Sequence, residues 1–205
     1  MKWCNLEVCF DDCKVATSFR KKVATIRRRG SIFFGDAPGG TGKTFLINLL
    51  LAKVRRRNEI ALAVASSGIA TLLTERRTAH SGFKLPLNLA NTETPTYRIS
   101  RNSGKAKVLK DCKLISWDEC TMSHKVAFEA IDVTLKDSKR NNNRMGGVTM
   151  VLAGDFRQTL PVIPRGTRAD DMQAFLKYRT YRISIQRFGL TTNMRVHLNG
   201  DSCAQ

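Results

Sequence analysis

A glycine-rich segment at residues 37–44, with the sequence APGGTGKT, has the composition needed to bind phosphate groups. Its glycines allow the backbone to turn tightly enough for successive N–H groups to point at phosphate oxygens. Lys43 would reach the β- and γ-phosphates of a nucleotide, and the Thr44 hydroxyl would ligate Mg²⁺. The helix expected to begin here adds the positive end of its dipole. The segment matches a Walker A loop with alanine at the first glycine position, and it predicts a nucleotide-binding site.

Two adjacent acids end a second segment, residues 114–119, which has the mostly apolar sequence LISWDE. Asp118 would hold Mg²⁺ through the water shell of the metal, and Glu119 would orient and deprotonate the attacking water. An ordinary acidic turn after a strand is the alternative interpretation. The phosphate-binding segment upstream favours the nucleotide interpretation.

Two further segments carry polar groups suited to the same chemistry. Residues 154–161, with the sequence GDFRQTLP, follow another apolar segment, and there Gln158 would sense the γ-phosphate while Asp155 would brace the magnesium site. Near the end of the sequence, Arg195 would neutralise the charge that develops on the γ-phosphoryl group. Open α/β sheets bind ligands at the carboxyl ends of their strands, which is where these acids and Gln158 are expected.

The elements that must position these residues are short apolar strands alternating with helices. The clearest helical pattern has apolar residues at i, i+3, i+4 and i+7, opens at residues 42–44 and ends near 57–58. The alternation predicts an α/β fold, a mostly parallel sheet with helices on both faces. The predicted strands are nearly continuous apolar segments, as is typical of strands covered on both faces, and they lie at residues 31–34, 60–65, 113–117 and 148–153.

The remaining segments are predicted from their composition. Residues 84–107 contain two prolines and several Asn and Thr, and they predict a long loop or insertion. Residues 141–143, ahead of the glycines at 146–147, predict a second loop. Residues 1–30 predict a basic helical segment that needs the following sheet to fold against.

The charge balance favours a polyanionic partner. The sequence has 35 Lys and Arg against 17 Asp and Glu, a net charge of +18 at pH 7, and basic side chains near phosphates release condensed counterions. A solvated basic surface is the alternative. The longest stretch without a charge, residues 60–74, is too short for a transmembrane helix, so we expect no membrane partner. Six cysteines and three histidines show no zinc-ligand spacing, and we expect free thiols.

These motifs together resemble those of the Pif-one-like DNA helicases, especially the helicases encoded by Helitron transposons. The similarity extends over roughly residues 30–197 and keeps the order of the family's motifs. The matching segments are residues 36–47 (DAPGGTGKTFLI), 65–70 (ASSGIA), 78–81 (TAHS), 117–120 (WDEC), 154–164 (GDFRQTLPVIP) and 190–195 (LTTNMR).

The resemblance implies an ATP-dependent, Mg²⁺-requiring motor that moves 5′ to 3′ on single-stranded DNA and serves DNA repair, recombination and telomere maintenance. It implies a RecA-like P-loop ATPase domain at residues 31–205. It assigns catalysis to Lys43, Glu119, Gln158 and Arg195; nucleotide binding to Gly39, Gly40, Thr41, Gly42, Lys43 and Thr44; Mg²⁺ to Thr44 and Asp118; and DNA phosphate contacts to Ser66, Ser67, Thr78 and His80.

The sequence departs from the family's pattern in three places. Family members carry a glutamine ahead of the P-loop that contacts adenine, whereas the first glutamine here is Gln158, which leaves base selectivity open. The region around residues 65–81 is one residue short, and residues 75–77 (ERR) stand where the family often has glycines. The second RecA-like domain is absent from this sequence, so we expect a truncated chain that does not unwind DNA alone.

Two other functions compete with the ATP-hydrolysing helicase domain. A non-catalytic, nucleic-acid-binding helicase fragment would use the +18 charge for affinity and would not turn over ATP. An unrelated P-loop enzyme, such as a small kinase or a AAA-type ATPase, is disfavoured by the segments at 78–81 and 154–164. By resemblance to the family we expect a nuclear protein, with the mitochondrion as the alternative compartment.

Overall fold

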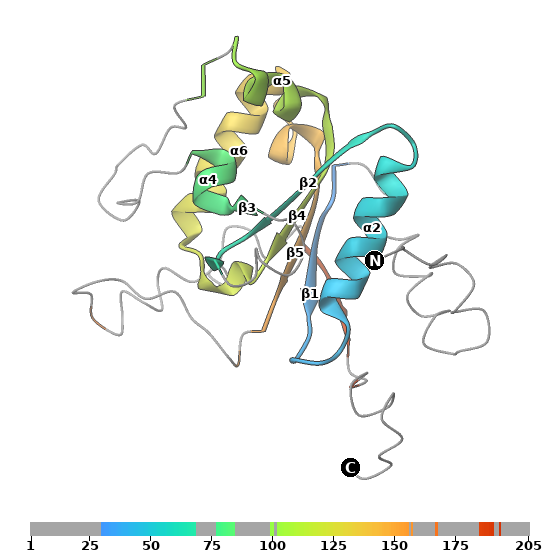
Figure 1. Ribbon diagram of the computed structural model, residues 1–205. Coiled ribbons are helices and arrows are strands. Elements are labelled where there is room, and N and C mark those ends of the chain that lie inside the picture. Colours follow the sequence, from blue (N-terminus) through green and yellow to red (C-terminus); the bar gives the residue numbers. More distant parts are fainter. Residues whose placement is uncertain are drawn as a thin grey trace.

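The computed structural model describes residues 30–68, 77–84, 99–100, 102–155, 157, 167, 185–190 and 193. Its described part forms a six-stranded parallel sheet in the order β3-β2-β4-β5-β1-β6, with helices on both faces (Figure 1). The elements are β1 (Ile32–Asp36), α2 (Lys43–Arg55), β2 (Ile60–Ala65), β3 (Arg77–Thr78), α4 (Ala79–Phe83), α5 (Gly104–Asp111), β4 (Cys112–Asp118), the 3₁₀ turn η3 (Cys120–Met122), α6 (Lys125–Lys139), the 3₁₀ turn η4 (Arg144–Gly147), β5 (Thr149–Gly154) and β6 (Ile185–Gly189).

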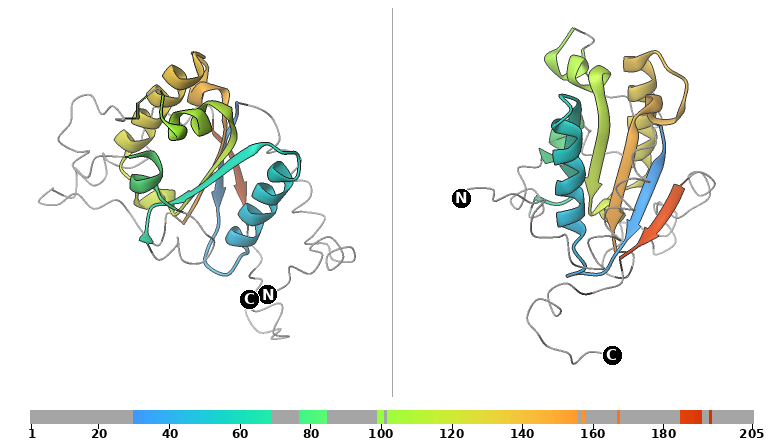
Figure 2. Two further views of the ribbon diagram at one scale, coloured as in Figure 1. Left: turned by 45° about the horizontal axis from the view of Figure 1, so that its top comes forward. Right: turned by 90° about the vertical axis from the view of Figure 1, so that its right-hand side faces the viewer.

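Alternating side chains of the central strands bury the two faces of the sheet against different helices. On one face Phe33 of β1, Leu114 of β4 and Val151 of β5 pack with the buried leucines of α2. On the other face the neighbouring residues Ile115 and Trp117 of β4 pack with α4, α5 and α6. The left view of Figure 2 shows the sheet between α2 and this second group of helices. Two-sided burial explains why the central strands have nearly continuous apolar sequences.

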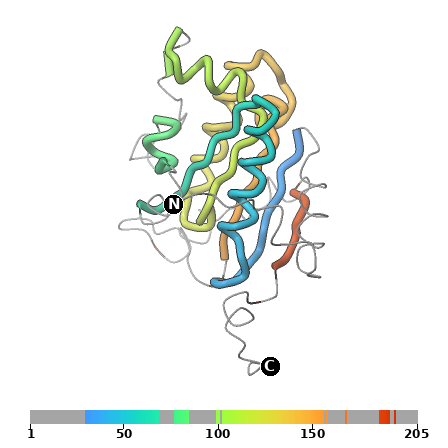
Figure 3. Tube along the Cα trace, turned by 45° about the vertical axis from the view of Figure 1, so that its right-hand side comes forward, coloured from blue at the N-terminus to red at the C-terminus, as the bar shows by residue number. Residues whose placement is uncertain are grey.

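The parallel arrangement brings all strand carboxyl ends to one edge of the sheet, at the bottom of Figure 1, where α2 also begins. Strands β3 and β6 form the two lateral edges of the sheet (Figure 3). The register places Asp36 beside Gly154 and also beside Gly189, and it places Ala65 beside both Asp118 and Thr78. Segments that are far apart in the sequence therefore converge on this edge.

The fold confirms the predicted α/β class and the four predicted strands, and α2 begins where the glycine-rich segment predicted it. β3 and β6 were not predicted because β3 has two residues and β6, with the sequence IQRFG, is mostly exposed. The prediction of a loop over 84–107 is wrong at its end, because α5 begins at Gly104. The Ser103 hydroxyl caps α5 by accepting a hydrogen bond from Ala106 N at 3.2 Å, and Leu109 anchors the helix in the core.

Other predicted segments have different outcomes. Residues 141–147 contain no long helix or strand, but their second part forms η4, in which Met145 and Gly146 adopt positive φ angles of 51° and 59°. The predicted helical segment at 1–30 lies outside the described residues except for Gly30. None of the helices in the described part is long and apolar enough to cross a membrane.

The N-terminus of α6 depends on a titratable cap. Nδ1 of His124 accepts a hydrogen bond from Val126 N at 3.2 Å, which requires an unprotonated nitrogen. Burial lowers the pKa of His124 below its usual 6.5, and the neighbouring Lys125 charge lowers it further. The unfolded chain therefore binds this proton more readily than the folded chain does. The stabilisation by this cap is complete above the unfolded pKa and is lost as the pH falls through the lowered native pKa.

We predict that His124→Asn reduces the acid sensitivity of folding, because asparagine caps helices well and does not titrate. Urea unfolding between pH 8 and pH 5 should show the wild-type chain losing about 0.5–1 kcal/mol relative to the variant as the pH falls. An identical pH dependence in both proteins would show that the cap does not contribute.

Candidate nucleotide-binding site

The loop between β1 and α2 has the backbone geometry of a phosphate cradle. Gly40 and Gly42 have φ angles of 83° and 85°, a backbone conformation that residues other than glycine rarely adopt. Thr41 is buried, and its hydroxyl donates to the carbonyl of Pro38 at 2.8 Å, which closes the loop on itself. Gly42 is the N-cap of α2 and has no side chain to bind the first-turn N–H groups. The N-terminus of α2 thus has no side-chain cap, and its positive dipole end suits the binding of an anion in the loop.

Lys43, the first residue of α2 after this loop, forms an ion pair with Glu119. The Nζ of Lys43 lies 3.6 Å from Oε1 of Glu119, and the two side chains are 11% and 27% exposed. Glu119 adopts a left-handed conformation with a φ angle of 50°, which is uncommon for a residue with a side chain. Its backbone N–H donates to Oδ1 of Asp118 at 3.0 Å. The end of β4 and the turn after it thus hold the two predicted acids next to each other, and Glu119 lies beside the Walker A lysine.

Two of the acids near this loop are buried, Asp118 at the end of β4 and Asp155 directly after β5. Asp155 follows β5 and is 3% exposed, and its Oδ1 accepts a hydrogen bond from Arg157 N at 2.9 Å. The backbone N–H of Ala37 donates to the carbonyl of Gly154 at 3.4 Å, which joins the phosphate loop to the end of β5. Asp118 is 5% exposed at the end of β4. Buried carboxylates are costly unless they are hydrogen-bonded, paired or bound to a metal.

These residues fit the type of magnesium site that a bound nucleotide completes. Within the described part of the chain, no three His, Cys, Asp or Glu side chains form a cluster that could hold a metal ion unaided. Mg²⁺ is usually held by one or two carboxylates together with substrate phosphates and water. Asp118, the Thr44 hydroxyl at the start of α2 and Asp155 are groups of this kind at the carboxyl edge of the sheet.

The segment that follows β6 also reaches the phosphate loop. A Cβ atom added to Gly40 would lie 2.7 Å from Oδ1 of Asn193, so the Asn193 side chain packs directly on the loop. Sequence reasoning did not assign a role to Asn193, although it precedes the predicted Arg195 by two residues. Arg195 and Gln158 lie outside the described residues, and their roles remain predictions.

The predicted DNA-contacting residues gather beside the nucleotide site. Ser66 and Ser67 follow β2, Thr78 ends β3, and His80 lies in the first turn of α4. All four are partly exposed at the carboxyl edge. The Thr78 hydroxyl caps α4 by accepting from Ser81 N at 3.2 Å, so it has a structural use as well.

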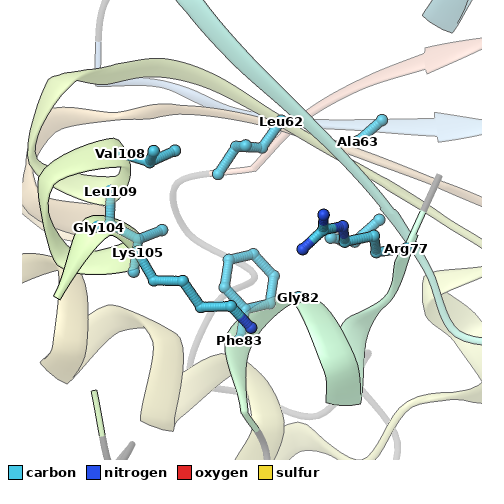
Figure 4. A pocket seen from close by; sticks show the side chains of 10 residues that line it. Leu62, Ala63, Arg77, Gly82, Phe83, Gly104, Lys105, Val108 and Leu109 are labelled. Carbon is cyan, nitrogen blue, oxygen red and sulfur yellow. The ribbon is translucent and has the colours of Figure 1, made fainter. Parts of the chain in front are cut away.

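A cavity of about 350 Å³ lies next to this group, between β2, β3, α4 and α5 (Figure 4). Its wall is mainly apolar, with Leu62, Phe83 and Leu109 among the lining residues. The guanidinium group of Arg77 points into it, and Nζ of Lys105 on the rim donates to the carbonyl of Ser81 at 2.9 Å. Arg77 directly precedes Thr78 and adds a positive charge beside the predicted DNA-contacting residues. In the sequence, Arg77 was one of three residues at which this chain departs from the family pattern, and no role was predicted for it.

Comparison with known sequences identifies relatives with a common description. The family model described as PIF1-like helicase matches residues 15–204. The ATP-dependent DNA helicase Pif1 of Psychrobacter is 30% identical over 151 residues, which cover 74% of this chain and 23% of that protein. The ATP-dependent DNA helicase PIF1 of Candida albicans is 28% identical over 165 residues, which cover 77% of this chain and 18% of that protein. The chain spans about a fifth of the length of these relatives.

Solved structures confirm the RecA-like fold. A crystal structure of Pif1 helicase from Bacteroides in complex with ADP-AlF3 and ssDNA matches with a TM-score of 0.76 at 22% identity, covering 90% of this chain and 43% of that one. The Pif1 helicase structure from Candida albicans matches with a TM-score of 0.69 at 21% identity, covering 88% of this chain and 40% of that one. Since the matching family model spans nearly all of its residues, this chain belongs to the PIF1-like helicase family.

Proposed function

We propose that this chain is the ATPase domain of an ATP-dependent DNA helicase and couples Mg-ATP hydrolysis to movement along single-stranded DNA. The observation that carries the proposal is the meeting of Lys43 and Glu119, 3.6 Å apart, at the mouth of a glycine-rich phosphate loop. A lysine that binds the terminal phosphates and a carboxylate that activates water are the two groups that P-loop hydrolysis requires from one domain.

The free chain holds both groups in a resting pair. A γ-phosphate entering the loop attracts the Lys43 ammonium, because several phosphate oxygens carry more negative charge than one carboxylate. Glu119 is then free to accept a proton from water positioned beside the γ-phosphate. Asp118 and Thr44 would hold Mg²⁺, which when bound neutralises charge on the phosphate oxygens. Arg195 is proposed to supply a further positive charge toward the same group.

Single-stranded DNA is the polyanion that we propose for the edge formed by Ser66, Ser67, Thr78 and His80. The net charge of +18 supports a nucleic-acid partner. The named relatives are DNA helicases, and the Bacteroides structure contains ssDNA. Small hydroxyl side chains and backbone N–H groups at this edge suit contacts to phosphates, which carry no sequence information.

The finer features of the function rest on the family resemblance. They are movement in the 5′ to 3′ direction, service in DNA repair, recombination and telomere maintenance, and a nuclear location with the mitochondrion as the alternative. The proposed preference for ATP also rests on the resemblance, because the chain has no glutamine ahead of its phosphate loop.

We predict Mg²⁺-dependent ATP hydrolysis that single-stranded DNA stimulates. In a steady-state assay with and without oligothymidylate, Lys43→Ala should abolish activity because the phosphates lose their cation. Glu119→Gln should lower kcat by about 100-fold or more, since it removes the general base, while nucleotide still binds.

The behaviour of the wild-type chain in this assay separates the proposal from its alternatives. Salt-sensitive DNA binding without hydrolysis by the wild-type chain would contradict the ATPase proposal and support a non-catalytic DNA-binding fragment. Phosphoryl transfer to a small acceptor instead of water would identify an unrelated P-loop enzyme.

We predict that Arg77→Ala weakens oligothymidylate binding and reduces its salt dependence. The logarithm of the DNA-binding constant decreases linearly with the logarithm of the salt concentration. If Arg77 contacts one phosphate, the steepness of this decrease should be smaller in the variant by about 0.7, the value for one contact to a single strand. Fluorescence anisotropy titrations at several salt concentrations measure both quantities.

Arg57→Ala is the matched control, because it removes the same charge beyond the C-terminal end of α2, at the opposite edge of the sheet. An equal change of slope in both variants would show that only the net charge matters and that Arg77 makes no particular contact.

A further inference from the structure

Ser66, which follows β2, is hydrogen-bonded to both ends of the turn at residues 117–123. Its Oγ accepts a hydrogen bond from Nε1 of Trp117 at 2.9 Å and lies 2.6 Å from Oγ of Ser123. The backbone N–H of Ser66 donates to the carbonyl of Asp118 at 3.1 Å. We call Ser66, Trp117 and Ser123 the serine hub.

The serine hub holds both sides of the turn that carries the proposed catalytic glutamate, Glu119. Trp117 stands two residues before Glu119 and Ser123 stands four residues after it, so both ends of this turn are attached to one side chain. Trp117 is fully buried and stacks on Phe128 with a centroid distance of 4.3 Å, which fixes the strand side of the turn. The left-handed conformation of Glu119 lies between these two attachments.

Ser66 also belongs to the proposed DNA-binding edge. It follows β2 directly, beside Ser67, and Ala65 pairs with Thr78 of β3. A hydroxyl has one donor and two acceptor positions, and two of the three are used within the hub. The side chain of Ser66 is therefore directed mainly toward the turn that carries Glu119. This use is additional to the DNA phosphate contact that the family resemblance implies for Ser66.

We propose that Ser66 is a positioning residue that transmits the binding of single-stranded DNA to Glu119. The inference rests on the proposed function and deepens it by assigning a route between the two sites. A strand that contacts the backbone after β2 displaces Ser66, and the hub carries this displacement to the turn. Glu119, which pairs with Lys43 in the free chain, is thereby shifted toward the position in which it activates water.

The fluorescence emission of Trp117 can report a change in the serine hub. Trp3 is the other tryptophan in the sequence, so Trp3→Phe leaves Trp117 as the single indole. In this background, saturating oligothymidylate should change the emission of Trp117, because DNA alters the hydrogen bond between its Nε1 and Ser66. This readout does not depend on ATP hydrolysis.

Ser66→Ala is expected to lose most of this emission change at an oligothymidylate concentration that saturates the variant, as determined by its own anisotropy titration. DNA stimulation of kcat should fall about fivefold or more, the lower range of energetic coupling between two sites. The matched control is Ser138→Ala on α6, which removes a hydroxyl outside the hub and should behave as the parent does.

Ser123→Ala is a second test that remains available if Ser66→Ala does not fold. It removes the contact between Ser66 and Ser123 and keeps the hydrogen bond between Trp117 and Ser66. It should reduce the emission change and the stimulation in the same direction, with the unfolding curve confirming a folded protein. Unchanged emission and stimulation in both hub variants would overturn the proposal. Failure of the parent chain to bind oligothymidylate would instead contradict the proposed function itself, and the hub with it.

Discussion

The parallel pairing of the central strands is the constraint on which the rest of the structure depends. Parallel strands end at the same edge, and the observed register sets Asp36 beside Gly154 and Ala65 beside Asp118. The phosphate loop, the acidic turn and the proposed DNA edge are therefore neighbours, although about 80 residues separate the first two. A shift of one residue in this register would exchange the side chains that pack against α2 with those that pack against α4, α5 and α6, so the packing of the core helps to fix the site.

Charged side chains and strained backbone lie together at the carboxyl edge of the sheet, where the apolar core ends. Asp118 and Asp155 are buried, and each accepts a hydrogen bond from a backbone N–H of the turn that follows its strand. The left-handed conformation of Glu119 costs about 1–2 kcal/mol, which the surrounding core offsets. Such local strain is found at functional sites because it holds a side chain in a position that a relaxed turn would not provide.

Sequence reasoning identified the features with strong local signals. The APGGTGKT segment and the apolar runs around it predicted the phosphate loop, α2 and four strands, because glycine spacing and periodicity are local properties. β3 and α5 were missed, since two-residue strands and short capped helices depend on tertiary packing. The hydrogen bonds of Ser66 and the contact between Asn193 and Gly40 join residues distant in sequence, and no local pattern predicts them.

A crystal structure of this chain with Mg²⁺ and a non-hydrolysable ATP analogue would show whether this edge of the sheet is the nucleotide site. We predict that the terminal phosphates of the analogue lie in the loop of residues 37–44. We also predict that Nζ of Lys43 has left Glu119 for the γ-phosphate, with Asp118 directed toward the metal. An analogue bound elsewhere, with the pair between Lys43 and Glu119 intact, would contradict the assignment of this edge as the nucleotide site.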